Sequence, residues 1–316
     1  MSPRLSRLWI NYRGEAGLLA VLAAMTLLFE LRVRGFTGYG NLVQILMNVA
    51  VIGIVAVGEF FVIVGGGIDI SVGKVTALSG VLAAHLVSTW AIPVPLAILL
   101  TLAVGIAIGA LNGALSTCFR IPAFIVTLGA FSMVSGLTAV WTHGASVQLR
   151  EPGWLAAVGQ KPTPVLIMLA VFLLGWVVMA RTVFGRRLYA IGGNDQAARL
   201  AGIGVRLHRS ISYMIAGGLA ALGGIVAMSQ LRAGDPKAGE GLEFDAITAV
   251  VLGGTSLFGG EGKLLGVLVG AVFMGTLSTG LNQANVDSNY QSIIKGAVLV
   301  TAVLIDTTLR RRGRRA

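Results

Sequence analysis

Long apolar runs, separated by short polar or glycine-rich stretches, extend over nearly the whole chain. A helix that crosses the hydrocarbon core of a membrane needs about 20 mostly apolar residues. The pattern predicts such segments at residues 16–32, 41–64, 74–90, 93–118, 122–141, 163–181, 210–230, 244–259, 264–284 and 292–309. The shortest of them, 244–259, is a candidate re-entrant helix. We therefore predict an all-α polytopic membrane protein of about ten transmembrane helices, with broken or re-entrant segments.

The composition agrees with a lipid-facing surface. Hydrophobic residues make up 55% of the 316 residues and charged residues only 12%, whereas a soluble domain carries about 25% charged residues. This excludes a cytosolic enzyme, a disordered chain and a disulfide-stapled secreted module. Lys and Arg exceed Asp and Glu by 24 − 13 = 11, but the basic residues cluster between apolar runs, so we expect a membrane protein and no nucleic-acid partner.

The distribution of basic residues predicts the orientation, because cytoplasmic loops are enriched in Lys and Arg. Placing the N-terminus inside puts 17 of the 24 basic residues on the cytoplasmic side and 7 outside. Both termini are then cytoplasmic. Basic residues precede the first apolar run, as in a signal peptide, but the run continues through Phe29 and Leu31, which favours a retained helix.

Glycine is unusually frequent, with 44 residues, about twice the usual share. Small residues at four-residue spacing let helices pack closely in lipid. Two such ladders are Gly105, Gly109 and Gly113, and Gly262, Gly266 and Gly270. We expect both to be packing surfaces.

Residues 65–73 interrupt two apolar runs with three glycines, Asp69 and Ser71. Non-helical backbone and charge at membrane depth are tolerated only against protein or a wet cavity, and they indicate a functional site. The alternative is an interhelical turn in which Asp69 caps the next helix. Glu59 lies inside the preceding apolar run, and its carboxylate either lines a pathway or finds a partner on another helix.

Residues 182–209 form the longest predicted cytoplasmic loop of a single transmembrane domain over 1–316. Asn194 or Asp195 can cap a helix of about two turns, and Gly202 can end it. So short a helix is marginal by itself because nucleation is costly. We expect it to dock against a cytoplasmic partner, the alternative being a solvated basic loop that follows the positive-inside bias.

The predicted external stretch 234–245 concentrates the acids Asp235, Glu240, Glu243 and Asp245 among turn-forming residues. It either faces an external partner or covers a helix end. The histidines show no metal-ligand spacing, and Cys118 is the single cysteine, so we expect no metal and no cofactor. Neither Gly-Lys pair belongs to a Walker A phosphate cradle. If ATP drives this protein, the ATPase is another chain.

Four blocks of sequence resemble the ribose-type permeases, the membrane subunits of ABC importers for monosaccharides. The first block is GGIDISVG at 66–73, where the family signature has Leu at the position of Ile70. The others are residues 121–129, residues 189–194 with 197–203, and residues 243–247, 250–257 and 259–262. The four blocks occur in the same order as in the family, and together they extend over most of the chain.

The resemblance implies a multi-pass protein of the bacterial inner membrane that works with an ABC ATPase subunit and an extracytoplasmic sugar-binding protein. A second permease subunit, identical or a close paralogue, would complete the translocation pathway within the surrounding lipid. The candidate pathway residues are Glu59, Asp69, Ser71, Asn112, Phe124 and Thr127. The candidate ATPase-coupling residues are Asn194, Asp195, Ala198, Arg199, Leu200 and Gly202. The candidate contacts to the binding protein are Asp235, Glu240 and Glu243.

Two other transport functions remain open. One is an ABC permease for nucleosides or branched-chain amino acids. The other is an ion-coupled secondary transporter with Glu59 and Asp69 as proton or sodium sites, which broken helices near the midplane would suit. A membrane enzyme is disfavoured because the chain shows no candidate catalytic pair.

Overall fold

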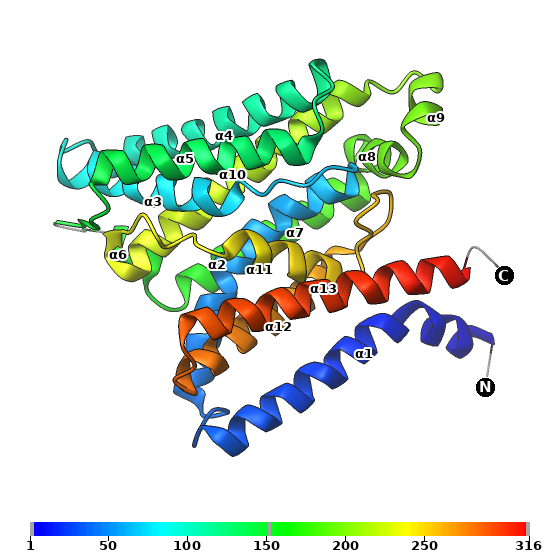
Figure 1. Cartoon of the computed structure of the whole chain (residues 1–316), viewed down its shortest axis with the longest axis horizontal. Coiled ribbons are helices and arrows are strands. Elements are labelled where there is room, and N and C mark those ends of the chain that lie inside the picture. Colours follow the sequence, from blue (N-terminus) through cyan, green and yellow to red (C-terminus); the bar gives the residue numbers. More distant parts are fainter. Residues whose placement is uncertain (1–2, 151–152, 154, 314–316) are drawn as a thin grey trace.

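The computed structural model describes the backbone of residues 3–150, 153 and 155–313, and the side chains from residue 17 to residue 308 within those ranges. The basic side chains near the two chain ends, on which the predicted orientation partly rests, lie outside the described side chains. The structure is helical almost throughout (Figure 1). The helices are α1 (Pro3–Arg32), α2 (Tyr39–Val64), α3 (Val72–Ser88), α4 (Val94–Cys118), α5 (Ala123–Thr142), α6 (Leu155–Gly159), α7 (Thr163–Arg181), α8 (Val183–Gly193), α9 (Asp195–Leu200), α10 (Val205–Leu231), α11 (Leu242–Leu252), α12 (Leu264–Gln283) and α13 (Ser288–Gly313).

Seven helices within the described residues are long and apolar enough to cross a membrane. They are α2, α4, α5, α7, α10, α12 and the Ser288–Thr308 part of α13. Helix α3 is a shorter apolar helix of 17 residues. The prediction of an all-α polytopic membrane protein is therefore confirmed at this level.

The predicted span 244–259 is wrong in its extent. Helix α11 has only 11 residues and ends at Leu252, which makes it about 16 Å long, half the thickness of the hydrocarbon core. The apolar character continues beyond it, but Gly253 and Gly254 end the helix, and Gly254 has a positive φ of 83°. A non-helical segment, 253–263, then leads to α12.

Two further helices interrupt stretches that the hydrophobic pattern left irregular. Helix α8 lies in the 182–209 loop, for which only one short helix was predicted, and α6 lies between α5 and α7. A small antiparallel pairing of β1 (Val147–Gln148) with β2 (Ala233–Gly234) ties the segment after α5 to the end of α10.

The most buried spanning helices are α2, α10 and α12, which form the interior of the bundle. Helices α4, α5, α7 and α13 cover them and carry mostly exposed or half-buried side chains, many of them large and apolar. Such an outward apolar surface fits a lipid environment. Helix α1 begins and α13 ends at the end of the bundle where α8 and α9 lie (Figure 1).

Both predicted glycine ladders are packing surfaces. Any side chain at Gly109 would clash with the backbone carbonyl of Tyr213, and Gly105 and Gly113 likewise abut α10. Gly266 and Gly270 of the second ladder meet the backbone of residues 249–253 at α11, and Gly262 meets the side chain of Thr255. The ladders hold α4 against α10 and α12 against α11 at backbone contact.

Helices α3 and α11 both begin inside the bundle after irregular segments (Figure 1). Their first turns meet, because a side chain at Gly73 would clash with Oε2 of Glu243 and crowd the carbonyl of Gly239. The segment before α3 and the segment before α11 therefore converge in the interior of the protein.

Candidate functional site

The segment between α2 and α3, residues 65–71, is held by buried polar groups, and we call it the connector. The backbone N–H of Asp69 donates to Oε1 of Glu59 at 3.0 Å. Oδ1 of Asp69 accepts from the N–H of Ser71 at 2.9 Å and from its hydroxyl at 2.5 Å. These bonds satisfy backbone groups that a helix would otherwise pair. The carboxylates of Glu59 and Asp69 therefore fix the connector in its non-helical path.

Three other helices attach to the same connector. Nδ2 of Asn112 on α4 donates to the Ser71 hydroxyl oxygen at 2.9 Å. The hydroxyl of Thr127 on α5 donates to the carbonyl of Ile68 at 3.3 Å, and the hydroxyl of Tyr213 on α10 lies 3.5 Å from the same carbonyl oxygen. The connector is thus the meeting point of α2, α3, α4, α5 and α10.

Five of the six candidate pathway residues belong to this network, and all five are buried, with Glu59 0% exposed. Phe124, at the start of α5, is 52% exposed and lies outside the network. The N-cap of α3 is Ser71, and the buried carboxylate of Asp69 bonds this residue without capping the helix itself. Glu59 has its partner on the connector and not on another helix, and its Oε2 has no hydrogen-bond partner among the described residues.

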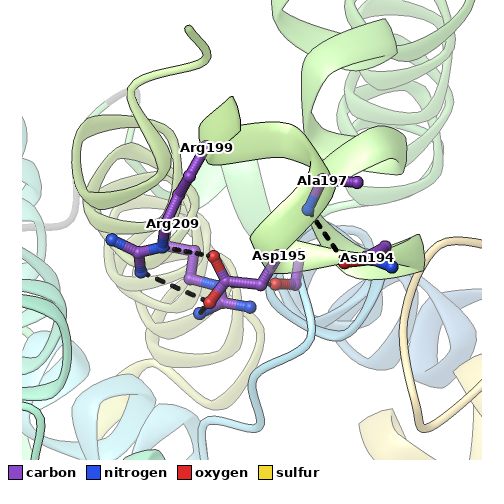
Figure 2. A network of polar contacts seen from close by, with 6 residues as sticks. Asn194, Asp195, Ala197, Arg199 and Arg209 are labelled. Carbon is purple, nitrogen blue, oxygen red and sulfur yellow. Dashed lines mark hydrogen bonds and ion pairs between the residues drawn. The ribbon is translucent and has the colours of Figure 1, made fainter. Parts of the chain in front are cut away.

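Helix α9 forms as the sequence predicts. Asn194 is its N-cap, and the side-chain oxygen accepts from the N–H of Ala197 at 2.9 Å (Figure 2). Gly202, with φ of 76°, follows the end of the helix. Ala198 is buried in a small cluster with Ile191 and Val205, while Leu200 is 91% exposed. The helix thus has one anchored face and one free apolar side chain.

Asp195 ties α9 to α10. Its Oδ1 accepts from Nε of Arg199 at 2.7 Å, and its Oδ2 accepts from Nη1 of Arg209 at 3.1 Å (Figure 2). The hydrogen bond from Arg199 and, secondarily, the positive charge of Arg209 lower the pKa of Asp195. The carboxylate is therefore ionised at neutral pH. Nε of Arg209 also donates to the carbonyl of Gly65 at 2.8 Å.

Three glycines from distant parts of the chain pack beside this ion pair, and we call them the glycine junction: Gly66, Gly192 and Gly259. A Cβ on Gly259 would lie 2.9 Å from the nitrogen of Gly66 and 3.0 Å from the Cα of Gly192. The N–H of Gly260 donates to the carbonyl of Val64 at 2.9 Å. The end of α8, the connector and the segment after α11 are therefore in backbone contact.

The three candidate contacts to an external protein differ in exposure. Glu240 is exposed and Asp235 is partly exposed. Glu243 is only 2% exposed and lies against Gly73 in the first turn of α11. Glu243 therefore offers almost no surface to an external protein in this structure, because the stretch turns inward where α11 begins. Asp245 is also buried and pairs with Nζ of Lys295 on α13 at 2.7 Å.

Sequence reasoning missed Arg209 and Tyr213 because their partners are 144 and 145 residues away. Arg209 carried a signal only as a basic residue before an apolar run. From the sequence, Arg209 is interpreted as a basic loop residue. Only the structure shows that its side chain bonds the carbonyl of Gly65.

Comparison with known proteins extends these observations. Residues 41–303 match the family described as branched-chain amino acid transport system / permease component. The ribose import permease protein RbsC of Escherichia coli K12 is 42% identical over 301 residues, with 92% of this chain and 93% of that protein covered. The D-allose transport system permease protein AlsC of the same strain is 36% identical over 302 residues, covering 94% and 92%. The xylose transport system permease protein XylH, also of that strain, is 33% identical over 362 aligned positions, covering 93% and 92%.

No solved structure gives a significant match. The family match spans most of the chain, and these relatives align along nearly their whole length. The described helices supply the multi-pass membrane architecture that a permease requires. The chain therefore belongs to the ribose-type permease family of ABC importers.

Proposed function

We propose that this chain is the membrane permease subunit of an ATP-driven importer for a monosaccharide or a related sugar or polyol. The proposal is supported by the relatives of this chain, which are named as permeases for ribose, D-allose and xylose. Two copies, or this chain and a close paralogue, form the pathway between them in the inner membrane. The chain itself hydrolyses no ATP and receives force from a separate ATPase subunit.

The observation that carries the proposal is that α9 is held in place by the rest of the protein and exposes one apolar side chain. A helix of six residues is marginal by itself, yet this one is capped by Asn194, anchored through Ala198 and tied to α10 by Asp195. Leu200 remains almost fully exposed beside Arg199. A preorganised helix with an exposed leucine fits a groove on a partner, since preorganisation lowers the cost of ordering on binding. We assign this face to the ATPase.

The polar network serves as the support of the pathway in this proposal. Buried side chains such as Asn112 and Thr127 have no surface to offer a sugar in this conformation. The connector that they hold lies between α2 and α3, and its displacement would open the interior. Phe124, exposed at the start of α5, is the candidate that a sugar would meet directly. An external binding protein delivers the sugar at the surface that carries Asp235 and Glu240.

Reconstitution tests the proposal. Proteoliposomes would contain this chain together with its partner ATPase and binding protein, and uptake of radiolabelled D-ribose, D-allose and D-xylose would be measured. We expect uptake to need ATP and both partners and to persist when an ionophore collapses ion gradients. Uptake by this chain alone, or loss of uptake with the ionophore at constant ATP, would instead support an ion-coupled transporter.

A second substrate class is separated by the binding protein. The family description names branched-chain amino acids, so the purified binding protein would be screened by thermal shift with pentoses, hexoses, nucleosides and leucine. Stabilisation by a monosaccharide alone supports sugar import. Stabilisation by leucine or a nucleoside would replace the substrate and leave the ABC permease role unchanged.

A further inference from the structure

We propose that Arg209 is a positioning residue that transmits movement of α9 to the connector. The inference rests on the proposed function, because it assumes that an ATPase moves α9. Arg209 contacts both ends of the route, with Nη1 on Asp195 of α9 at 3.1 Å and Nε on the Gly65 carbonyl of the connector at 2.8 Å. It does so from the first turns of α10, a helix that runs through the interior of the bundle.

The guanidinium suits this task better than other side chains. Its planar fork holds donors on separate nitrogens, so that one group binds two partners in a fixed relative geometry. Both bonds are charge-assisted, and such bonds are stronger than neutral ones. A lysine offers a single nitrogen on a flexible stem. Arg209 therefore constrains the distance between α9 and the connector.

The connector passes a displacement onward because it is fixed further along by buried bonds. Gly65 is joined through Gly66 and Gly67 to Ile68 and Asp69, whose backbone groups bond Thr127 and Glu59. Side chains from α4, α5 and α10 all contact the same few residues. A shift at Gly65 thus reaches the helices that would open the pathway, in a contiguous chain of packed and hydrogen-bonded groups.

The glycine junction directs the movement. Backbone contact of Gly66 with Gly192 and Gly259 leaves no side chain to absorb a displacement between these segments. The ion pair of Arg209 and the glycine junction both lie against the same connector residue, since a Cβ on Gly66 would sit 3.3 Å from Nη2 of Arg209 and 3.9 Å from the Cα of Gly192. A displaced α9 therefore carries the start of the connector with it.

The test measures coupling in the complete reconstituted importer, as sugar molecules imported per ATP hydrolysed. The variants are Arg209→Gln, Arg209→Lys, Asp195→Asn and the double variant Asp195→Asn with Arg209→Gln. The matched control is Arg206→Gln, which removes the same charge from an exposed residue one turn earlier on α10. Copurification of the ATPase is measured in parallel, with the probe sugar being the one that wild type transports best.

We expect Arg209→Gln to lower the import-to-hydrolysis ratio about tenfold while the ATPase still copurifies, which is the change in an equilibrium that loss of one charge-assisted hydrogen bond produces. Arg209→Lys should recover only part of the ratio, and Arg206→Gln should match wild type. Because Asp195 and Arg209 act in one route, the double variant should be no worse than Arg209→Gln.

Several outcomes overturn the inference. An unchanged ratio in Arg209→Gln, or equal losses of import and hydrolysis in proportion to lost assembly, would make Arg209 a structural brace only. If Arg209→Gln does not assemble, Asp195→Asn decides the matter, since it leaves the bond to Gly65 available and should still lower the ratio. A wild-type importer that needs no ATPase would refute the proposed function instead, so the two failures are distinguishable.

Discussion

The backbone N–H of Asp69 donates a hydrogen bond to Oε1 of Glu59 at 3.0 Å, ten residues back along the chain. This bond places a buried carboxyl group of α2 against the non-helical connector, three residues before α3 begins. Glu59 is therefore an acceptor that shapes the backbone. Another side chain that places an oxygen acceptor at the same position can therefore replace Glu59.

Glu59→Gln should preserve both stability and ATP-driven uptake, because the amide oxygen still accepts from the N–H of Asp69. Glu59→Ala leaves that buried donor without a partner, at a cost of about 1–3 kcal/mol in the free energy of unfolding. Denaturation of the detergent-solubilised protein and uptake in proteoliposomes measure the two effects. Loss of uptake in a stably folded Glu59→Gln would indicate that the titrating proton itself is used, as in an ion-coupled transporter.

Gly109→Ala should destabilise the protein, because a Cβ there would clash with the carbonyl of Tyr213 and push α4 away from α10. Overpacking of this kind costs about 1–3 kcal/mol. The control is Gly129→Ala on α5, where nothing lies within 4 Å of the added carbon and alanine is intrinsically the better helix former. The apparent melting temperature in one detergent compares them. Equal melting temperatures would refute the close contact between these helices.

Leu200→Ala should weaken binding of the ATPase about tenfold or more, because burial of a leucine is worth about 1.5–3 kcal/mol. The isolated permease should keep its melting temperature, since Leu200 is almost fully exposed. Leu31→Ala, at an exposed leucine of α1, is the matched control. Titration of ATPase onto permease in nanodiscs gives both affinities. An effect of the same size from Leu31→Ala would remove α9 as the docking helix.

Glu240→Lys should slow association with the external binding protein, and the effect should shrink as ionic strength rises, as for exposed charges at an interface. Glu243→Gln is informative beside it, because Glu243 is buried against α3. The buried variant should change the association rate little in protein that remains folded. Stopped-flow mixing at two salt concentrations measures the rates. A stronger effect from Glu243→Gln than from Glu240→Lys would place the contact elsewhere.

The sequence predicted best where the signals were local. Helix α9 was correct because an N-cap, a run of helix formers and a terminal glycine all fall within ten residues. Helix α8 was missed although Phe184, Leu188 and Ile191 repeat at helical spacing, because Arg186 and Arg187 made the stretch resemble a solvated loop. Two of these apolar residues, Leu188 and Ile191, are completely buried.

Long-range relationships account for what the sequence could not predict. The apolar run at 244–259 has the composition of a spanning helix, but Gly253 and Gly254 end α11 early, and residues 249–253 pack against Gly266 and Gly270 instead of facing lipid. In the same way, the acidity of Glu243 suggested a surface, whereas its neighbour across the fold is Gly73. The composition of a segment indicates its average environment, whereas these particular residues are surrounded by protein.

The shortness of α11 bears on how the protein is made. An apolar helix of 11 residues is too short to be held across a bilayer by lipid alone, and its buried Asp245 has its partner at Lys295 on α13, which follows α11 by more than 30 residues. During insertion, α11 therefore lacks the packing partner and the ion pair that stabilise it until α12 and α13 have entered the membrane. Truncation after α12 should therefore leave Asp245 without Lys295 and make α11 more susceptible to proteolysis in the membrane.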